Sequence, residues 1–456
     1  MPNLPKVPKL PNPLGQDPYG AFVRSGPGAL LAARTGLPRP PRLRRFEPGQ
    51  ELLTGPALVV ELAGATRSAQ VAGWLREAGA RVLDDLAAAG EDRLGAIVVE
   101  ATGVRRVAEL AALREQLAPA FKRTAPSGRV VVLTGVPQEF TDPEARAVQR
   151  GLEGFARSLG KEARGGTTVN LLRVATGAGT ALRSALEFLC SARSAFVDGQ
   201  PIVVGPGAPV PARERRVAVV TGAAQGIGAA CAEVLARSGH HVVCVDVAAA
   251  GERLAAVANR VHGSTLHLDV TADDAPARLA DHLAVRFDGA DVVVHNAGVT
   301  RDRSFVNLDA AAWDAVLGVN LLAPLRLTAG LLERGGALAP GARLVCLSSI
   351  NGLAGAKGQT NYATSKAGLV GLVEALAVPL AERGMAVNAV APGFVETPMT
   401  AAMPPVPREV GRRASSLQQG GLPVDVAEAV AWLAQPDAAG VDGQVLRVCG
   451  QSVLGA

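Results

Sequence analysis

The sequence alternates short apolar runs with helix-length segments, and it does so in two series, over residues 51–204 and 217–456. Such alternation predicts parallel strands joined by helices that cover both faces of a sheet. We therefore expect an α/β protein with two doubly wound parallel-sheet domains. The predicted strands are Ala57–Leu62, Arg81–Leu83, Ala96–Glu100, Arg129–Thr134, Thr167–Val174 and Pro201–Val204, then Arg216–Thr221, His241–Asp246, Thr265–Asp269, Asp291–His295, Ala342–Ser348, Ala386–Ala391 and Gln444–Val448.

The two series resemble each other in order, which indicates two copies of one topology. Val197–Gln200 and Val441–Gln444 both read Val-Asp-Gly-Gln, and Arg129–Thr134 matches Arg343–Ser348. Residues 205–216 hold three Pro and two Gly, which predicts an exposed linker between the copies.

Residues 1–50 are predicted to form a Pro-rich arm, because recurrent Pro opposes helix. One short helix is expected near Gly28–Thr35. The basic cluster Arg39–Arg45 is interpreted as a solvated linker, with anion binding as the alternative.

Composition excludes several classes of protein. With 48% apolar and 19% charged residues the chain is globular, and its net charge of +5 comes from scattered Arg without a basic tract, so we expect no nucleic-acid partner. Five single Cys without a CxxC pair predict reduced thiols and no metal site. The apolar stretch 217–236 is interrupted by Gln225 and Glu233, so no membrane span is expected and the predicted location is the cytoplasm.

The first chemical signal is a glycine-rich loop between a predicted strand and a predicted helix. The loop reads Thr221-Gly-Ala-Ala-Gln-Gly-Ile-Gly228, which gives Gly222, Gln225, Gly226, Ile227 and Gly228 as candidate cofactor contacts. Glycine allows the backbone to approach a pyrophosphate, and a helix N-terminus supplies free N–H groups. A structural turn is the less specific alternative.

The second signal is Asp246, 18 residues after Gly228 at the end of the next predicted strand. A carboxylate there accepts both hydroxyls of an adenosine ribose, and it repels a 2′-phosphate. The residues that directly follow it contain no Arg. The sequence therefore predicts NAD(H) in preference to NADP(H), the alternative being a surface Asp at a strand end.

The third signal is Tyr362 followed by Lys366, a spacing that places both on one face of a helix. The ammonium is expected to lower the phenol pKa. Ser349 ends a strand 13 residues earlier and is expected to bind a substrate carbonyl oxygen. The three side chains predict an acid–base site for hydride transfer to a ketone.

With these signals, residues 216–456 resemble the short-chain dehydrogenase/reductase family, in particular its 3-oxoacyl-thioester reductases of high molecular weight. The resemblance rests on TGAAQGIG, HNAG, Ser349, YATSK and the segment from Pro392 to Thr397, with His295 as a departure from the usual Asn. It implies Asn320, Ser349, Tyr362 and Lys366 as catalytic residues, Asn320 through a proton-relaying water. It implies further cofactor contacts at Asp269, Val270, Asn296, Ala297, Gly298, Pro392, Gly393, Val395 and Thr397, besides Tyr362 and Lys366.

The resemblance implies reduction of a 3-oxoacyl group carried by coenzyme A or an acyl carrier protein. Asp246 makes NADH the expected reductant, and Gln225, which stands where NADP-using members of the family commonly have Arg, supports this. An alcohol, 3-hydroxyacyl-CoA or steroid dehydrogenase of the same family is the alternative, and a non-enzymatic nucleotide sensor is a third. The segment Phe394–Leu417 is expected to form a substrate lid, in which Arg412 and Arg413 meet phosphates or form a charged helix face.

The first copy is expected to lack chemistry, because Ala145, Gln149 and Gly135 stand where the second copy has Tyr362, Lys366 and Ser349. We expect it to imitate a neighbouring subunit, so that a homodimer reproduces a tetramer-like assembly; a domain kept for solubility or for an unknown ligand is the alternative.

Overall fold

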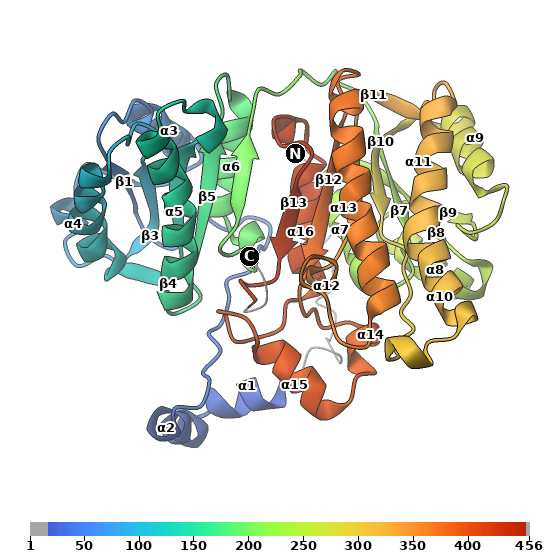
Figure 1. Cartoon of the computed structure of the whole chain (residues 1–456), viewed down its shortest axis with the longest axis horizontal. Helices are drawn as coiled ribbons and strands as arrows, with labels where there is room; N and C mark the ends of the chain where they lie inside the picture. Colours follow the sequence, from blue (N-terminus) through green and yellow to red (C-terminus); the bar gives the residue numbers. More distant parts are fainter. Residues whose placement is uncertain (1–16, 453–456) are drawn as a thin grey trace.

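The computed structural model describes residues 17–452 and contains two parallel β-sheets that lie side by side (Figure 1). The first sheet has the strand order β2-β1-β3-β4-β5-β6 and the second has the order β13-β12-β11-β10-β7-β8-β9. All neighbouring strands in both sheets are parallel. The prediction of two doubly wound parallel sheets is confirmed. The second sheet has the Rossmann order, and the first repeats it without a counterpart of β9.

The elements follow the predicted alternation closely. The strands are β1 Ala57–Glu61, β2 Val82–Leu83, β3 Leu94–Glu100, β4 Thr124–Gly135, β5 Thr168–Val174, β6 Pro201–Val204, β7 Arg216–Thr221, β8 His240–Asp246, β9 Ser264–His267, β10 Ala290–His295, β11 Leu338–Leu347, β12 Ala386–Pro392 and β13 Val445–Val448. The α-helices are α1 Pro18–Val23, α2 Gly26–Thr35, α3 Ser68–Glu77, α4 Leu110–Phe121, α5 Pro143–Glu162, α6 Thr180–Cys190, α7 Gly226–Arg237, α8 Gly251–Arg260, α9 Ala275–Phe287, α10 Ala310–Leu317, α11 Ala323–Glu333, α12 Ile350–Ala354, α13 Thr360–Ala381, α14 Pro398–Ala401, α15 Pro405–Arg413 and α16 Pro423–Leu433. Short 3-10 helices lie at Ala87–Ala89, Val107–Glu109, Pro137–Glu139, Ala192–Ser194, Ala248–Ala250, Phe305–Asn307 and Pro436–Ala438, and a π-helical turn lies at Gly318–Leu322.

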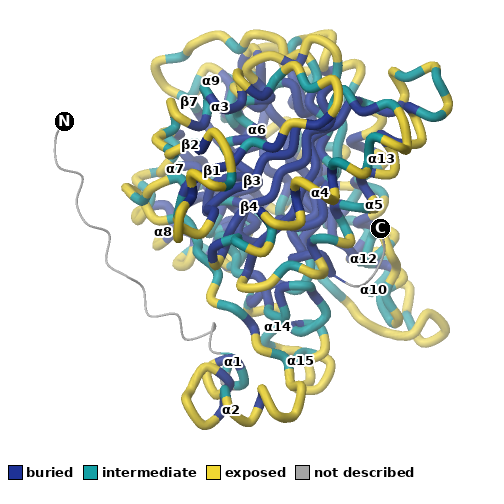
Figure 2. The backbone as a smooth tube through the Cα atoms, turned by 90° about the vertical axis from the view of Figure 1, so that its left-hand side faces the viewer, coloured by how far each residue is buried: buried dark blue, intermediate teal, exposed yellow. Residues whose placement is uncertain are grey.

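Three clusters of buried apolar side chains hold the layers together. Figure 2 shows that the backbone of the strands is the most buried part of the chain. One cluster lies under α4 and α5 on one face of the first sheet, and another lies under α9, α11 and α13 on one face of the second. The third joins α3 and α6 of the first half to α7, α8 and α16 of the second without interruption. The two halves therefore share one continuous core. All five cysteines are free thiols buried in these layers.

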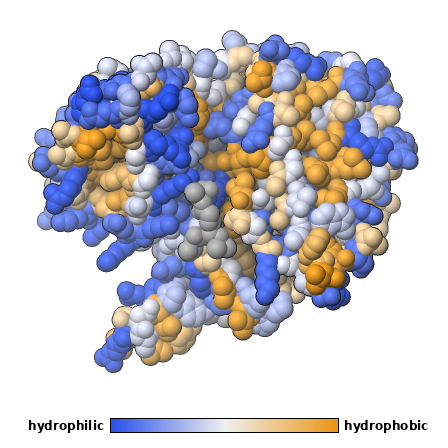
Figure 3. All heavy atoms as spheres, in the orientation of Figure 1, coloured by the Kyte–Doolittle hydropathy of each residue, from blue (hydrophilic) through white to orange (hydrophobic). Residues whose placement is uncertain are grey.

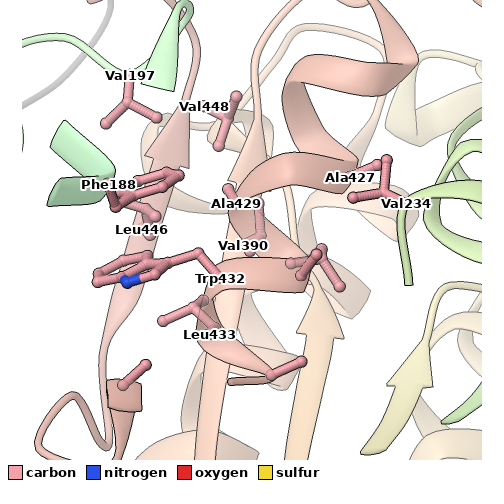
Figure 4. Close-up of a cluster of buried hydrophobic side chains, with 14 of the residues drawn as sticks. Phe188, Val197, Val234, Val390, Ala427, Ala429, Trp432, Leu433, Leu446 and Val448 are labelled. Carbon is pink, nitrogen blue, oxygen red and sulfur yellow. The ribbon is translucent and has the colours of Figure 1, made fainter. Parts of the chain in front are cut away.

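The seam between the halves has approximate twofold symmetry. Phe188 of α6 stacks on Trp432 of α16 with ring centroids 4.3 Å apart and planes 3° from parallel (Figure 4). Gln444 Oε1 accepts a hydrogen bond from the backbone N–H of Val203 at 2.7 Å, and Gln200 Oε1 accepts one from Arg447 at 3.2 Å. The two Gln end the repeated Val-Asp-Gly-Gln segments, so equivalent residues make the same contact from either side.

The arm is packed against both halves, and its basic cluster is not solvated linker throughout. Arg45 forms a bidentate ion pair with the buried Asp425, in which Nε donates to Oδ1 at 2.9 Å and Nη2 donates to Oδ2 at 3.0 Å. Arg44 donates from its backbone N–H to Ser127 Oγ at 3.1 Å and from Nη1 to Leu52 O at 2.9 Å. The interpretation as a solvated linker is therefore wrong for these two residues, since each fastens the arm to the body.

The expected helix near Gly28–Thr35 is present as α2, which begins two residues earlier, and α1 precedes it. The Pro residues before residue 17 lie outside the described residues.

Two long apolar helical segments cover the second sheet on its outer side. Ala310–Glu333 and Thr360–Ala381 are long and apolar enough to cross a membrane by length and composition alone, with 39% and 33% of their most apolar windows buried. Both pack against the parallel sheet through the core cluster of α11 and α13. They nevertheless leave apolar side chains such as Leu325 and Val378 exposed, and Figure 3 shows apolar surface over α11 and α13.

Candidate active site

A cleft of about 510 Å³ opens where the carboxyl ends of β7, β8, β10, β11 and β12 meet. Strand order reverses between β7 and β10, and such a switch point is where open parallel sheets bind ligands. Except for Asn320, every residue that the sequence nominated lies in the wall of this cleft: Gly222, Gln225, Gly226, Ile227, Gly228, Asp246, Asp269, Val270, Asn296, Ala297, Gly298, Ser349, Tyr362, Lys366, Pro392, Gly393, Val395 and Thr397.

The glycine-rich loop is shaped to receive a phosphate group. Gly222 has a φ of +66°, and a Cβ on Gly228 would lie 2.1 Å from the Gly222 carbonyl oxygen, so a side chain at 228 is excluded. Asn296 Nδ2 ties the loop to β10 by donating to the carbonyls of Thr221 and Gly222. Helix α7 then begins without a side-chain cap, which leaves its first N–H groups facing the cleft. These residues fit the pyrophosphate of a dinucleotide.

Asp246 is fixed at the end of β8. Its two carboxylate oxygens accept backbone N–H groups of Ala224 at 3.0 Å and Val247 at 2.9 Å. Arg253 of α8 lines the same cleft, and it was not among the predicted residues because it does not directly follow Asp246 in the sequence. The signal that could have found it is the position of Arg253 in the first turn of the next helix.

Tyr362 and Lys366 lie one turn apart on α13, and both line the cleft with Ser349. The Lys366 ammonium nitrogen donates to the Leu347 carbonyl oxygen at 2.7 Å and lies 5.6 Å from the centre of the Tyr362 ring. Ser349 Oγ also accepts the Asn351 N–H at 3.2 Å, so this residue caps α12 as well as facing the cleft.

The expected lowering of the Tyr362 pKa is wrong for this arrangement. Burial raises the pKa of Tyr362 to about 12. The hydrogen bond with Ser349 lowers this pKa, and the negative charge of Asp302 raises it further. Burial also lowers the pKa of Lys366 to about 8. The ammonium is directed at a carbonyl oxygen rather than at the phenol, so desolvation dominates and Tyr362 holds its proton at neutral pH.

Asn320 is the one nominated residue outside the cleft wall. It is fully buried in the π-helical turn, where Oδ1 accepts the Val299 N–H at 2.8 Å and Nδ2 donates to Val299 O at 2.9 Å and Ser365 Oγ at 3.2 Å. Its side chain therefore fixes the loop after β10, whose Gly298 and Val299 form cleft wall. His295, the departure from the family pattern, is also a core residue: it pairs with Thr328 Oγ1 at 2.9 Å, and burial lowers its pKa to about 4.

The two arginines of the expected lid, Arg412 and Arg413, form ion pairs and hydrogen bonds within the protein. Arg412 Nε donates to Glu396 at 2.5 Å and Arg412 Nη1 to Glu409 at 2.6 Å. Arg413 donates to Glu409, to the Gln418 carbonyl oxygen and to Asp17. The expectation that they meet substrate phosphates is therefore wrong in this arrangement, because carboxylates of the same chain already neutralise them.

The equivalent end of the first sheet carries no comparable site. Gln149 stands in the place of Lys366 and is buried, with its amide bonded to Gly135 N, Ala101 O and Val104 O. The buried Glu100 carboxylate accepts the N–H groups of Thr66 and Arg67 just before α3, where an incoming phosphate would bind. At this edge of the first sheet, backbone groups of the same half are therefore bonded to Gln149 and Glu100.

The Rossmann order, the glycine-rich loop and the Ser, Tyr and Lys around one cleft define a dinucleotide-dependent oxidoreductase. A family model described as enoyl-(acyl carrier protein) reductase matches residues 222–450. The chain belongs to the short-chain dehydrogenase/reductase family.

Several characterised relatives match the second half of the chain. It is 36% identical to a 3-oxoacyl-[acyl-carrier-protein] reductase of Thermotoga maritima over 53% of this chain and 99% of that protein. It is 40% identical to the reductase of the same name from Pseudomonas aeruginosa, over 52% and 96%. It is 39% identical to a cis-4-hydroxycyclohexanecarboxylate dehydrogenase of Sinomonas cyclohexanicum, over 52% and 95%.

Proposed function

We propose that this chain reduces the 3-oxo group of an acyl thioester, carried by coenzyme A or an acyl carrier protein, to a 3-hydroxy group with NAD(H). The observation that carries the proposal is the placement of Tyr362 and Ser349 in the wall of the cleft that the glycine-rich loop also lines. The similarity to 3-oxoacyl reductases over nearly their whole length supports this substrate class.

The reaction divides between a bound cofactor and the side chains. A reduced nicotinamide supplies the hydride. The Ser349 hydroxyl orients the carbonyl oxygen of the substrate by a hydrogen bond, and Tyr362 gives its phenolic proton to that oxygen as it becomes an alkoxide. A phenol with a pKa of about 12 enters the reaction protonated, as a donor must. Lys366 fixes the end of β11 by donating from its ammonium nitrogen to the Leu347 carbonyl oxygen, and so positions the wall beside Ser349.

Turnover tests the proposal directly. We expect oxidation of the reduced cofactor with acetoacetyl-CoA and longer 3-oxoacyl-CoAs. Tyr362→Phe should lower kcat by roughly 10²- to 10⁴-fold while leaving cofactor affinity nearly unchanged. Thr364→Ala, an exposed position on the same helix, is the matched control. Substantial turnover by the Phe variant would refute the proton-donor role.

The preference for NAD(H) rests on Asp246, whose fixed carboxylate lines the cleft. Arg253 is the opposing charge on the same wall, because a guanidinium attracts a 2′-phosphate. We expect kcat/KM to be at least roughly fivefold higher with NADH than with NADPH, since one repulsive charge pair is worth about 1 kcal/mol or more. Arg253→Ala should widen that ratio and Asp246→Ala should narrow it. A parent enzyme that prefers NADPH would overturn the assignment.

A second candidate function is oxidation of a hydroxy compound by the same residues. It is favoured by the dehydrogenase from Sinomonas cyclohexanicum, which is as similar to this chain as the reductases are. Two results together would establish this candidate instead: the chain reduces NAD⁺ in the presence of cis-4-hydroxycyclohexanecarboxylate, and it does not oxidise NADH in the presence of 3-oxoacyl-CoAs.

We further propose that the chain forms a homodimer through the exposed apolar face of α11 and α13. Leu325 and Val378 lie on these helices with 38% and 69% of their surface exposed. The seam between the halves already reproduces a symmetric interface within one chain, with Phe188 on Trp432 at its centre. One further contact between two chains would then place four sheets in a tetramer-like arrangement.

The oligomeric state tests this assembly. Light scattering should give a dimer for the unmodified chain. Val378→Asp should give monomers, because a charge at the centre of an apolar contact loses its hydration. Val285→Asp, at an equally exposed position on α9, should leave the dimer intact. A monomeric parent chain would contradict the proposal.

A further inference from the structure

The N-terminal arm reaches α15, the helix that follows the cleft-wall residues Thr397 to Thr400. Helix α1 lies beside α15 at one end of the molecule, far from the first sheet to which the arm's sequence leads (Figures 1 and 2). Helix α15 follows the cleft-wall residues Thr397 to Thr400 and occupies the segment expected to act as a lid. The family match begins at residue 222, so the arm is an addition to the shared domain.

Arg413 at the end of α15 is the point of contact. Its Nε donates to Glu409 at 2.7 Å, its Nη1 to the Gln418 carbonyl oxygen at 2.9 Å, and its Nη2 to Asp17. The Tyr19 ring lies against the same guanidinium, 4.6 Å from ring centre to Cζ. Every nitrogen of the group therefore has a partner, and two of its four contacts come from the arm. A lysine could not make these contacts together.

The arm is fastened again beyond α15. The Arg39 N–H donates to Gln418 Oε1 at 3.0 Å, and Gln419 Nε2 donates to the Pro41 carbonyl oxygen at 2.7 Å. Arg45 then pairs with Asp425 at the start of α16. The arm thus follows the whole segment from the lid helix to the shared core, with fixed points at both ends.

Helix α15 depends on such polar contacts for its position. Arg412 is its only buried residue, and its apolar side chains Val406 and Val410 are exposed. On the cleft side, Arg412 and Arg408 both pair with Glu396, which directly precedes the wall residue Thr397. On the other side, the arm holds Arg413. A helix with so little apolar burial has a low free energy of local opening, so each ion pair weighs heavily.

We infer that the arm is a brace for the lid segment: Asp17 and Tyr19 hold Arg413 so that α15 stays in place beside the cleft-wall residues Thr397 to Thr400, and these are positioning residues for the acyl substrate. The inference rests on the proposed function for its substrate. Loss of the brace should raise KM for 3-oxoacyl thioesters and leave the pyrophosphate site untouched, because the glycine-rich loop lies on β7 and α7.

Asp17→Asn is the decisive variant in the full-length chain. Asn caps a helix as well as Asp does, so the bond from the Gly20 N–H at 2.8 Å is kept and only the charge facing Arg413 is lost. Glu47→Gln is the matched control, an exposed carboxylate of the same arm with no ion pair among the described residues. Asp17→Glu tests rescue by a longer carboxylate.

Two measurements separate the possible failures. Hydrogen exchange of residues 405–413 needs no turnover and should become roughly tenfold faster in Asp17→Asn, because the bond from Arg413 loses its ionic partner, and stay unchanged in Glu47→Gln. KM for 3-oxodecanoyl-CoA should rise about five- to tenfold in Asp17→Asn, the dissociation constant of NADH should change less than twofold, and Asp17→Glu should recover part of the loss.

Equal exchange in Asp17→Asn and Glu47→Gln would overturn the brace. Faster exchange with an unchanged KM would overturn its role in positioning substrate. An unmodified chain without turnover would refute the proposed function and with it the substrate role, while the exchange data would still decide whether the arm holds α15.

Discussion

Replacement of Trp432 by Ala should uncouple the two halves of the chain. Its side chain is 99% buried and stacked on Phe188, and its indole N–H donates to Ser184 Oγ at 3.2 Å. A buried indole removes roughly 200 Å² from water, which is worth about 5 kcal/mol at 25 cal/mol per Å². Partial collapse of the cavity reduces this, so we expect a loss of about 3–5 kcal/mol in the free energy of unfolding.

Urea unfolding with probes in each half measures the effect. The chain has three Trp, of which Trp74 lies on α3 of the first half and Trp313 on α10 of the second. In a Trp432→Phe background, which keeps an aromatic ring in the stack, replacing either Trp74 or Trp313 by Phe leaves one fluorescent reporter. Both reporters should unfold at one midpoint, because the core runs through the seam.

With Ala at position 432 the two midpoints should separate. A double-mutant cycle with Phe188→Ala should then give a coupling energy of about 1 kcal/mol or more, as expected for a stacked aromatic pair. Separate midpoints already in the Phe background, or a loss below about 1 kcal/mol for Trp432→Ala, would show that the seam does not join the halves energetically.

Two further perturbations test the cleft. Lys366 has a pKa of about 8 in the folded chain and 10.5 ordinarily, so between these pH values the unfolded chain binds more protons than the folded chain. The free energy of unfolding should therefore rise with pH over this range by up to about 3 kcal/mol, and Lys366→Met should remove that rise in urea titrations. An identical pH dependence in the Met variant would contradict the burial of the Lys366 charge. Gly228→Ala should weaken NADH binding at least tenfold in a fluorescence titration, because the new Cβ would lie 2.1 Å from the Gly222 carbonyl oxygen. Gly151→Ala, which has open space around its Cβ, should leave NADH binding unchanged. Unimpaired binding in Gly228→Ala would show that the loop does not need Gly at position 228.

Elements that arise from local patterns were predictable from the sequence. Pro201–Val204 and Arg216–Thr221 form strands with the predicted bounds, because a short β-branched run between Gly or Pro residues has few other solutions. Strand β4 begins at Thr124 rather than at the predicted Arg129. Pro126 and Ser127, the latter with a φ of +56°, interrupt the apolar sequence pattern, but the pairing of β4 with β3 continues on both sides of them. Strand β9 ends at His267, and Asp269 instead closes a turn by accepting the Thr271 N–H.

Contacts between segments that are distant in the chain could not be predicted from the sequence. Arg45 pairs with Asp425 across 380 positions, and nothing near Arg45 in the chain marks it as different from a solvated Arg. Tyr362 and Lys366 were placed correctly on one helix face, whereas the direction of the Tyr362 pKa depended on how deeply the phenol is buried and on where the ammonium points. Spacing determines which side chains can meet; desolvation, which decides their protonation, is a property of the packed molecule.

Phe188 facing Trp432 has a consequence for how this protein can vary. At the axis of a true homodimer any substitution occurs twice, so a large ring must tolerate its own copy opposite. Here the two positions are encoded separately, and a six-membered ring lies against an indole. Because the tether makes their encounter intramolecular, the pairing also persists at any dilution. A substitution on one side of the axis therefore leaves the residue on the other side unchanged.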